Sequence, residues 1–350
     1  MNDLKNSEGN LETEKKPFFS IIMPVYNAGA YIKESLRSIS SQDFQDWELI
    51  IVDDRSTDDS LAKVMDFSRN DKRIKIFTST VNSGRAHIPR LRAAGLATGR
   101  YIVTVDADDV VSSDLLSTHY QYIASQDADL VIPEMWNLKD NKREKILPKD
   151  SIDISKTWVG KDLIEHTLVN WEIPMAGFAV RRELYLKADE HMSSDDLESI
   201  FSDELHSRWL LAACDRVCLC DAQYDYRQHA GSITHRNLPR FIDSRLHTCD
   251  KLISMTATVF GKDTLTNIKA IENKFFESVG LLRMINRTKL KRQQKKTLIR
   301  RISIAMNDLD IKRLKGHISS RYLALMSLPI PLARIALKII DSIIKIKNGI

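Results

Sequence analysis

The chain has 350 residues and a mass of 40.1 kDa, with 43% hydrophobic and 28% charged residues. These proportions are ordinary for a folded protein, and they exclude a disordered, collagen-like or wholly membrane-embedded chain. The formal net charge of +5 hides a polarised distribution, because residues 281–350 carry 17 basic and 3 acidic side chains. At roughly 150 residues per domain, the length predicts about two domains.

Residues 1–16 are polar and charged, and they lack the apolar core of a signal or transit peptide. We expect a flexible tail there and a cytoplasmic protein. Three of the four cysteines, Cys214, Cys218 and Cys220, fall in an apolar stretch that predicts a buried strand, and their spacing lacks the paired CxxC layout of a zinc site. Buried thiols are the simpler interpretation, and a reducing compartment agrees with them.

From Phe18 onward, short apolar runs alternate with helical patterns. Strands are predicted over residues 19–25, 47–52, 74–78 and 101–105, and helices over residues 31–42, 60–69 and 88–97. This alternation predicts an α/β fold with a mainly parallel sheet flanked by helices, here over residues 17–240. Helical periodicity, as in residues 268–285, then replaces the strand signals, so residues 241–325 are expected to form a basic helical region.

The last segment, residues 326–350, predicts a basic amphipathic helix. No stretch of the sequence reaches the 18 or more uncharged apolar residues that a spanning helix needs. Together with the basic run over residues 283–301, it predicts attachment to anionic lipid on the inner face of the cell membrane. The alternative is docking on its own domain or on a second copy of the chain in a homo-oligomer. The wide aliphatic face argues against nucleic acid. The polar positions of this helix are Arg334, Lys338, Asp341 and Lys345.

The strongest local signal is a group of carboxylates at the end of a predicted strand. Asp106, Asp108 and Asp109 lie within four residues of one another. Carboxylates so close together repel, which raises their pKa values unless a cation sits among them. Oxygen ligands with positions left open suit Mg²⁺ or Mn²⁺ completed by substrate phosphate oxygens. The alternative is an acidic turn that caps the next helix.

Two more polar clusters follow strands that should end at the same edge of the sheet. Asp53 and Asp54 can accept hydrogen bonds from a base N–H or from ribose hydroxyls. Residues Pro24 to Asn27 place the ring of Tyr26 where a nucleobase could stack. The clusters together predict a site for a nucleotide diphosphate and a divalent cation.

In these motifs the sequence resembles the family 2 glycosyltransferases with the GT-A fold. Their PVYN, VDDGSTDDS, DADD and YYRQHxxSIT patterns correspond to residues 24–27, 52–60, 106–109 and 226–234, in the same order. The resemblance implies an inverting, metal-dependent glycosyltransferase. Such an enzyme moves a sugar from a nucleotide-sugar, usually a UDP-sugar, to a hydroxyl of a saccharide or lipid-linked saccharide in bacterial cell-surface polysaccharide synthesis.

The resemblance also implies roles for single residues. Tyr26 would stack on the base, and Asp54 or its neighbour Asp53 would read uracil. Asp106 would touch the ribose or the sugar, and Asp108 would bind the Mn²⁺ or Mg²⁺ that holds the diphosphate.

Inversion needs one carboxylate that removes the proton of the acceptor hydroxyl. In the family this base lies in an acidic pair before a helix, which here is Asp203-Glu204. Alignment backward from Val217 favours Asp203, whereas matching the pair as a unit favours Glu204. Arg227 and His229 lie on the segment that often closes over the nucleotide in this family, where a guanidinium could grip the diphosphate. For His229, a plain surface loop is an equal alternative.

The sequence departs from the family pattern at two places. Arg55 stands where the family has glycine, and it could contact phosphate or face water. In the altered NxGxxxARNxG segment, residues 82–84 survive, and Arg90 keeps the family spacing of 16 residues to Asp106. Acceptor recognition is expected from residues 132–182, where tryptophans could offer stacking faces.

Two other classes of function fit parts of the sequence. A non-catalytic nucleotide-sugar-binding subunit of a polysaccharide assembly complex would explain the altered segment around Arg90. An aspartyl-phosphate phosphatase would use Asp106 as nucleophile and Asp108 as acid. In such phosphatases, however, the motif ends the first strand, and here several strands precede it.

Overall fold

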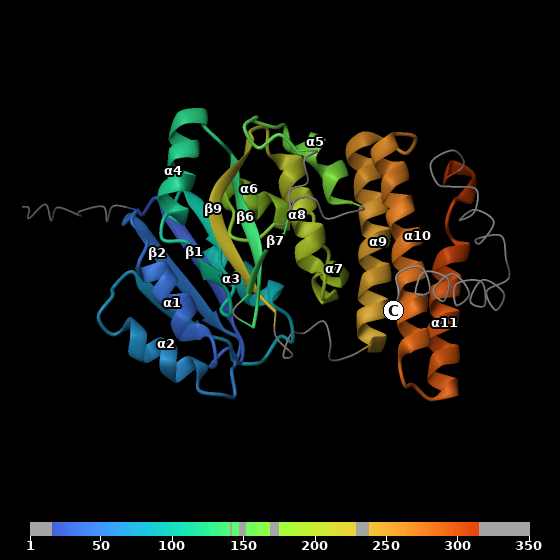
Figure 1. Ribbon diagram of the computed structural model, residues 1–350, viewed down its shortest axis with the longest axis horizontal. Helices are drawn as coiled ribbons and strands as arrows, with labels where there is room; N and C mark the ends of the chain where they lie inside the picture. Colours follow the sequence, from blue (N-terminus) through green and yellow to red (C-terminus); the bar gives the residue numbers. More distant parts are fainter. Residues whose placement is uncertain (1–15, 141, 147–151, 169–174, 229–237, 315–350) are drawn as a thin grey trace, which may run out of the picture.

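The computed structural model describes residues 16–140, 142–146, 152–168, 175–228 and 238–314 (Figure 1). A sheet with helices on both faces occupies one side of the molecule, and three long helices stand next to it on the other side. The strands are β1 (Phe19–Val25), β2 (Trp47–Asp53), β3 (Ile74–Thr78), β4 (Tyr101–Thr104), β5 (Val110–Val111), β6 (Leu130–Lys139), β7 (Lys142–Ile146), β8 (Ala179–Arg181) and β9 (Val217–Arg227). The helices are α1 (Ile32–Ser40), α2 (Ser60–Ser68), α3 (His87–Leu96), α4 (Leu115–Gln126), α5 (Gly160–Ile164), α6 (Arg182–Asp189), α7 (Ser194–Glu198), α8 (Ser202–Ala213), α9 (Leu238–Phe260), α10 (Leu265–Arg287) and α11 (Arg292–Asn307), with short 3₁₀ turns at Glu165–Thr167 and Ile311–Leu314.

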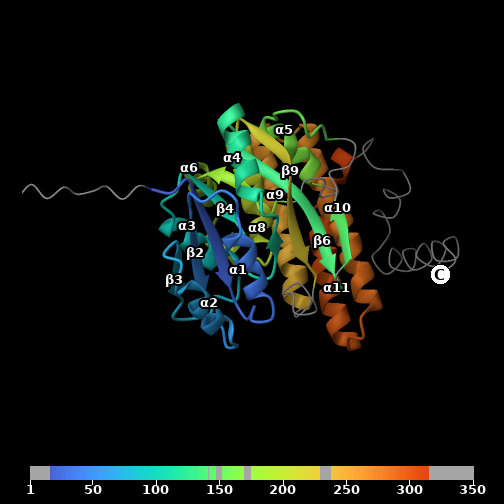
Figure 2. The same ribbon diagram turned by 60° about the vertical axis from the view of Figure 1, so that its left-hand side comes forward.

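The described strands form one sheet in the order β3-β2-β1-β4-β8-β6-β9-β5, with β7 paired to β6. β1 to β4 are parallel to one another, as the sequence predicts. Beyond β4 the sheet is mixed, because β8 runs antiparallel to both of its neighbours while β6 and β9 pair in parallel. Figure 2 shows the long β6 and β9 beside the N-terminal strands.

Each face of the sheet has its own apolar core. Helices α1, α2 and α4 cover one face, on which Ile21 and Met23 of β1 pack against Leu36. Helices α3, α5, α6 and α8 cover the other face, on which Ile22 and Ile50 lie. β1 is buried along its whole length, and the continuous apolar run FSIIMPV is typical of such a central parallel strand.

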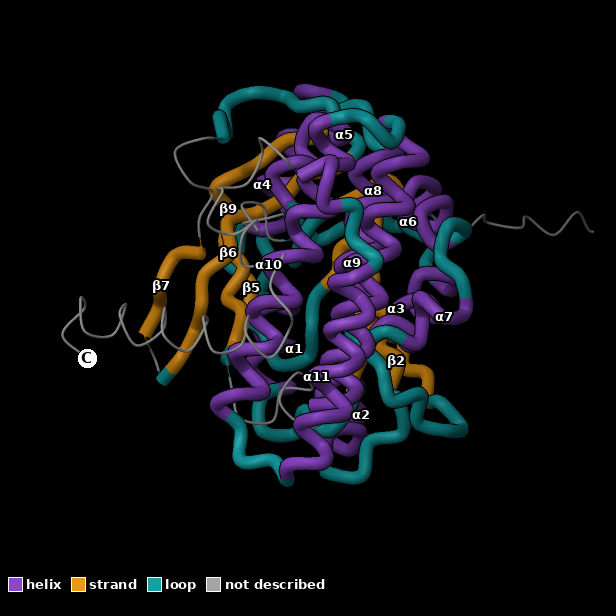
Figure 3. The backbone as a smooth tube through the Cα atoms, turned by 90° about the vertical axis from the view of Figure 1, so that its right-hand side faces the viewer, coloured by secondary structure: helices purple, strands orange, loops and turns teal. Residues whose placement is uncertain are grey.

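The three long helices share a third core, formed by residues such as Phe275, Leu282 and Ile302. Leu252 and Met255 of α9 belong instead to the core under the sheet. The helical region is therefore packed onto the α/β part (Figure 3). The expected boundary near Arg240 falls at the start of α9.

The predicted elements agree with the structure to within a few residues at each end. The stretch Cys214 to Cys220 is divided, because Cys214 ends α8 and the strand begins at Val217. All four cysteines are free and buried, which confirms that interpretation. No helix among the described residues is long and apolar enough to cross a membrane. Residues 1–15 of the expected tail, His229 and the expected amphipathic helix over residues 326–350 lie outside the described residues. So does Trp171, one of the tryptophans in the stretch expected to recognise the acceptor.

Candidate active site

Three parallel strands end at the same edge of the sheet. In the register of β1 and β2, Val25 lies opposite Asp53, and β4 runs along the other side of β1. The polar clusters that follow these strands, residues 24–27, 53–56 and 106–109, are therefore neighbours, as the sequence predicts.

The loop after β1 is fixed by the loop after β2. Oδ1 of Asn27 accepts a hydrogen bond from the backbone N–H of Thr57 (2.8 Å), and the N–H of Asn27 donates to Oγ of Ser56 (3.0 Å). Tyr26 projects from this fixed loop with 43% of its surface exposed, so its ring is open to a planar partner. Pro24, in contrast, is buried inside β1, where it supports the strand and presents no surface.

Asp53 and Asp54 are 1% and 2% exposed. Oδ2 of Asp54 accepts hydrogen bonds from the N–H and Oγ of Ser83 at 2.9 and 2.7 Å, and Oδ2 of Asp53 accepts one from the N–H of Ser56 at 3.1 Å. The Oδ1 atoms of both have no hydrogen-bond partner among the described residues. Buried acceptors are seldom left unpaired, so these two oxygens fit the N–H and O–H donors of a ligand.

Ser83 explains why part of the altered family segment survives. It belongs to residues 82–84, and the side chain of Asn82 also donates to the backbone carbonyl of Asp54 (2.8 Å). The segment therefore still supports the carboxylate that the resemblance assigns to the base of the nucleotide.

Arg55 occupies a left-handed backbone conformation, with φ of 60°. Glycine adopts this conformation at the least cost, which accounts for the glycine in the family pattern. The Arg55 guanidinium donates to the carbonyl of Thr80 (2.8 Å), in the loop after β3. Arginine at this position therefore joins two loops.

Arg90 and Asp106 form an ion pair in which Nη2 of Arg90 lies 2.6 Å from Oδ1 of Asp106. Burial alone would lower the pKa of this guanidinium, but the nearby carboxylates of Asp106 and Asp203 raise it overall. The altered segment thus still delivers a fixed positive charge to the acidic motif after β4.

Asp109 holds the acidic turn against β9. Its Oδ2 accepts a hydrogen bond from the Tyr224 hydroxyl (2.6 Å), and its Oδ1 accepts one from the N–H of Arg227 (2.8 Å). Burial, together with the charges of Asp108 and Asp106, raises the pKa of Asp109. Both oxygens of the Asp109 carboxylate are thus paired with groups of β9, so its main role is to hold the turn.

Arg227 is also held by this turn. Its Nε donates to the backbone carbonyl of Asp108 (2.9 Å), and its Nη2 contacts Oε2 of Glu34 (2.6 Å). The guanidinium therefore lies beside the acidic motif and bridges β9 to α1 in this conformation.

Asp106 and Asp108 are only partly buried, and their carboxylates could hold a divalent cation. The described residues contain no group of three or more His, Cys, Asp or Glu arranged to hold a metal ion. A cation bound by one or two carboxylates, with phosphate oxygens and water completing its shell, needs no such group. The donor set therefore fits Mg²⁺ or Mn²⁺ that binds together with a diphosphate.

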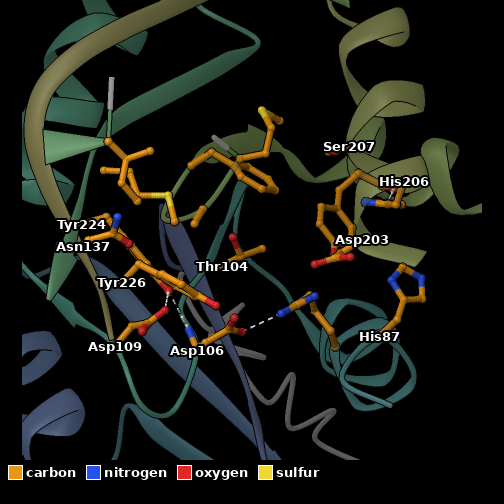
Figure 4. A pocket seen from close by; sticks show the side chains of 17 residues that line it. His87, Thr104, Asp106, Asp109, Asn137, Asp203, His206, Ser207, Tyr224 and Tyr226 are labelled. Atoms are coloured by element: carbon orange, nitrogen blue, oxygen red, sulfur yellow. Dashed lines mark hydrogen bonds and ion pairs between the residues drawn. The ribbon is translucent and has the colours of Figure 1, made fainter. Parts of the chain in front are cut away.

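A pocket of about 330 Å³ extends from the acidic motif toward α8 (Figure 4). One wall is polar and carries Asp203, His206 and Ser207 of α8. The opposite wall is largely apolar and comes from the stretch expected to recognise the acceptor. That wall includes Met135, Ile146, Met175, Ala176 and Phe178, with the polar Asn137. Trp136 and Trp158 of this stretch are not among the residues that line the pocket.

The two acidic residues at the start of α8 point to different places. Asp203 is exposed and lines the pocket, as Figure 4 shows. Glu204 is 3% exposed, and its Oε2 lies 2.6 Å from Nη1 of Arg245 in α9. Glu204 is therefore turned away from the pocket and into an ion pair.

Sequence reasoning missed several residues of this site. Oδ1 of Asp189 lies 3.3 Å from Nε2 of His87 and 3.2 Å from Nε2 of His206, and both histidines line the pocket. Tyr224, which holds Asp109, was also missed. No motif marks these residues, although His206 stands three positions after Asp203, where a helix presents the same face.

Comparisons with known proteins point to the same family as the sequence motifs. Residues 20–186 match the family model described as "Glycosyl transferase family 2". Glycosyltransferase GlyG of Streptococcus pneumoniae serotype 4 is 29% identical over 223 residues, which are 61% of this chain and 72% of that protein. The beta-1,3-glucosyltransferase WfgD of Escherichia coli is 43% identical over 91 residues, which are 26% of this chain and 35% of WfgD.

The fold is also found in a solved structure. The crystal structure of S. aureus TarS 1-349 in complex with UDP-GlcNAc superimposes with a TM-score of 0.64 at 20% identity, covering 91% of this chain and 88% of that one. TarS thus shares the fold of this chain, including its C-terminal helices. The part of this chain that is similar to glycosyl transferase family 2 is therefore residues 20–186.

Proposed function

We propose that the protein transfers a sugar, with inversion, from a UDP-sugar to a hydroxyl of a saccharide or lipid-linked saccharide. One observation carries the proposal. Asp203, the exposed carboxylate of α8, lines the same pocket as Asp106, whose neighbour Asp108 can hold a divalent cation. The candidate catalytic base and the candidate diphosphate site are thus at the same pocket, which has a volume of about 330 Å³.

The nucleotide would lie along the ends of β1 and β2. Tyr26 would stack on the uracil, and the unpaired Oδ1 atoms of Asp53 and Asp54 would accept hydrogen bonds from the base and the ribose. Asp108, with Asp106, would hold Mn²⁺ or Mg²⁺ at the diphosphate. When bound, this ion neutralises the negative charge that develops on the leaving group.

The acceptor hydroxyl would attack the anomeric carbon from the face opposite the diphosphate, and Asp203 would remove the proton of this hydroxyl. Glu204 is a poor candidate for this role, because its carboxylate is buried against Arg245. Arg90 keeps a positive charge close to the carboxylates of both Asp106 and Asp203. Arg227 could turn from Glu34 toward the diphosphate, because the Glu34 side chain is 57% exposed and can take water in its place.

The relatives support the choice of substrates. WfgD is named for UDP-Glc and a diphosphoundecaprenol-linked GlcNAc, and the TarS structure contains UDP-GlcNAc. The apolar wall of the pocket could pack against the apolar face of a sugar ring, while the α8 wall offers hydrogen-bonding groups to its hydroxyls. We therefore infer a bacterial cell-surface glycan as the product.

The decisive experiment measures release of the nucleoside diphosphate over a panel of UDP-, GDP- and dTDP-sugars with Mn²⁺. We expect one UDP-sugar to be turned over by the wild type. Asp108→Ala should lose metal-dependent release, and Asp203→Asn should still bind UDP while losing turnover. Asp195→Asn is the matched control, since Asp195 is an exposed aspartate in the first turn of α7. Full turnover by Asp203→Asn would refute the assignment of the base, and UDP binding without turnover by the wild type would favour a non-catalytic binding subunit.

The basic surface of α11 supports attachment to anionic lipid. Lys291, Arg292, Lys296 and Arg300 are exposed there, beside the exposed Ile304. Such a surface is attracted to anionic headgroups, and salt screens the attraction. The full chain should co-sediment with phosphatidylglycerol vesicles at low salt but not with phosphatidylcholine vesicles, and Lys296→Glu/Arg300→Glu should weaken binding. Unchanged binding by this variant, or a dimer in sedimentation without lipid binding, would contradict the proposal.

A further inference from the structure

The first turn of α8 presents two neighbouring carboxylates in different directions. Successive residues on a helix are rotated by about 100° from one another. With Asp203 at the pocket, Glu204 therefore enters the interior, where it is 3% exposed. Any group that fixes Glu204 also fixes the orientation of Asp203.

Arg245 of α9 contacts α8 on both sides of Asp203. Its Nη1 lies 2.6 Å from Oε2 of Glu204, and its Cζ lies 3.7 Å from the ring centroid of Phe201. Phe201 is the residue that precedes the first turn of α8. The planar guanidinium thus pairs with a carboxylate at its edge and stacks on an aromatic ring with its face, a combination that lysine cannot reproduce.

The contacts of Arg245 belong to a cluster of two positive and two negative side chains, of which Glu277 is partly exposed. Arg208 is fully buried in α8, with Nη2 3.9 Å from Oε1 of Glu204, and Glu277 of α10 lies 3.7 Å from Nε of Arg245. Arg208 also donates to the backbone carbonyls of Glu204 and Thr167. Two arginines and two glutamates therefore connect α8 to α9 and α10.

The residues leading to α8 are held by the same face of α9. The hydroxyls of Ser199 and Thr248 are 3.0 Å apart, and the N–H of Ile200 donates to Oγ of Ser244 (3.3 Å). Residues 199–204, which bring the chain to Asp203, thus contact Ser244, Arg245 and Thr248 of α9.

We propose that Arg245 is a positioning residue for the reaction, through which the helical region sets the place of Asp203 in the pocket. The inference rests on the proposed function, because it takes Asp203 as the base. Among the described residues, Arg245 is not part of the pocket lining, and its contacts reach Asp203 indirectly, through Glu204 and Phe201. A displacement of about 1 Å at a catalytic group can reduce turnover by roughly a hundredfold.

The test compares Arg245→Met, Arg245→Lys and the double variant Glu204→Gln/Arg245→Met in the full chain. Removing one member of a buried ion pair is strongly destabilising, whereas replacing both is often neutral. The double variant also keeps the charge balance, because Arg208 and Glu277 remain. Arg301→Met is the matched control, since Arg301 forms an ion pair with Asp243 elsewhere on α9.

Turnover is measured as UDP release from the donor found in the sugar panel, below the melting temperature of each variant. We expect the double variant to melt near the wild type and to bind UDP within about twofold, while kcat falls by roughly tenfold to a hundredfold. Arg245→Lys should recover part of the loss in kcat. Arg301→Met should leave kcat and the affinity for UDP unchanged.

Wild-type kcat in a folded double variant would overturn the inference, and so would a loss confined to the donor KM. Asp203→Asn, measured alongside, separates the two proposals. If Asp203→Asn is inactive while the Arg245 variants are fully active, only the positioning role fails. If Asp203→Asn is itself fully active, the assignment of the base fails and the positioning role with it.

Discussion

Arg90 reaches from α3 to the acidic motif after β4, and its Nη2 lies 2.6 Å from Oδ1 of Asp106. The Arg90 side chain is 11% exposed and that of Asp106 is 39% exposed, so the charge is buried on one side and open to the pocket on the other. Two parts of the site that are separated by 16 residues in the sequence are thereby held as one unit.

The first prediction concerns this ion pair. Arg90→Gln removes the charge and keeps a hydrogen-bond donor, so Asp106 should become free to move and to repel Asp108. A hydrogen bond to a charged group contributes roughly 1.5–3 kcal/mol, which corresponds to a loss of about tenfold to a hundredfold in kcat/KM for the donor. Steady-state UDP release measures the loss.

Arg92→Gln is the control for this prediction. Arg92 lies on the same helix, but its guanidinium is turned to the carbonyl of Thr78 (3.2 Å) at the surface. Its substitution should change kcat/KM by less than about twofold, the effect of a typical surface substitution. Equal losses of kcat/KM in Arg90→Gln and Arg92→Gln would mean that the substitutions act by disturbing the fold of α3 and that the ion pair with Asp106 has no specific role.

Tyr26 provides the second prediction. Stacking of a base on an aromatic side chain contributes about 1–3 kcal/mol, so Tyr26→Ala should weaken UDP binding by roughly fivefold to a hundredfold. Because the ring is 43% exposed, the melting temperature should change little. Titration calorimetry with UDP measures the effect.

Tyr120→Ala is the control for this prediction. Tyr120 on α4 is 39% exposed, close to the exposure of Tyr26, and its substitution should leave UDP affinity unchanged. Unchanged affinity in Tyr26→Ala would place the base elsewhere.

The sequence predicts the nucleotide end of the site better than the pocket, and the reason is physical. Asp53, Asp106 and Tyr26 immediately follow apolar strands, and the strand pattern alone places such residues at one edge of a parallel sheet. The lining of the pocket depends on how α6, α8 and β6 pack, which no local pattern encodes. His87 and Asp189 come together only through that packing.

The choice between Asp203 and Glu204 shows the same limit. Alignment alone leaves the two adjacent carboxylates nearly equivalent. The structure distinguishes them through Arg245, which is 41 residues further along the chain and belongs to another helix. The mixed half of the sheet was missed for a similar reason, because short strands such as β8 carry no clear alternation of apolar and polar residues.

Two glycines provide a matched pair for stability. A Cβ atom on Gly160, at the start of α5, would lie 2.1 Å from the backbone carbonyl oxygen of Leu211. Since backbone cannot move aside cheaply, Gly160→Ala should destabilise the fold, by about 1–3 kcal/mol as for other overpacked sites. Around the same position on Gly280 in α10, no atom of the described residues lies within 4 Å, so Gly280→Ala should stabilise by roughly 0.5–1 kcal/mol. Urea unfolding of both variants measures the difference, and a stabilising Gly160→Ala would contradict the packing of α5 on α8.

Two buried histidines predict how stability depends on pH. Burial lowers the pKa of both His119 and His206 from 6.5 to about 4. The unfolded chain therefore binds these protons more readily, and stability should be fully present above pH 6.5 and fall as the pH drops toward 4. Each histidine contributes up to roughly 3 kcal/mol of this loss.

Unfolding by urea at pH 7, 6, 5 and 4.5 should show the decline in the free energy of unfolding. His119→Gln, which can still donate to the Gly177 carbonyl, should flatten it, and His191→Gln, at an exposed position, should not. A slope unchanged by His119→Gln would show that other groups cause the acid sensitivity.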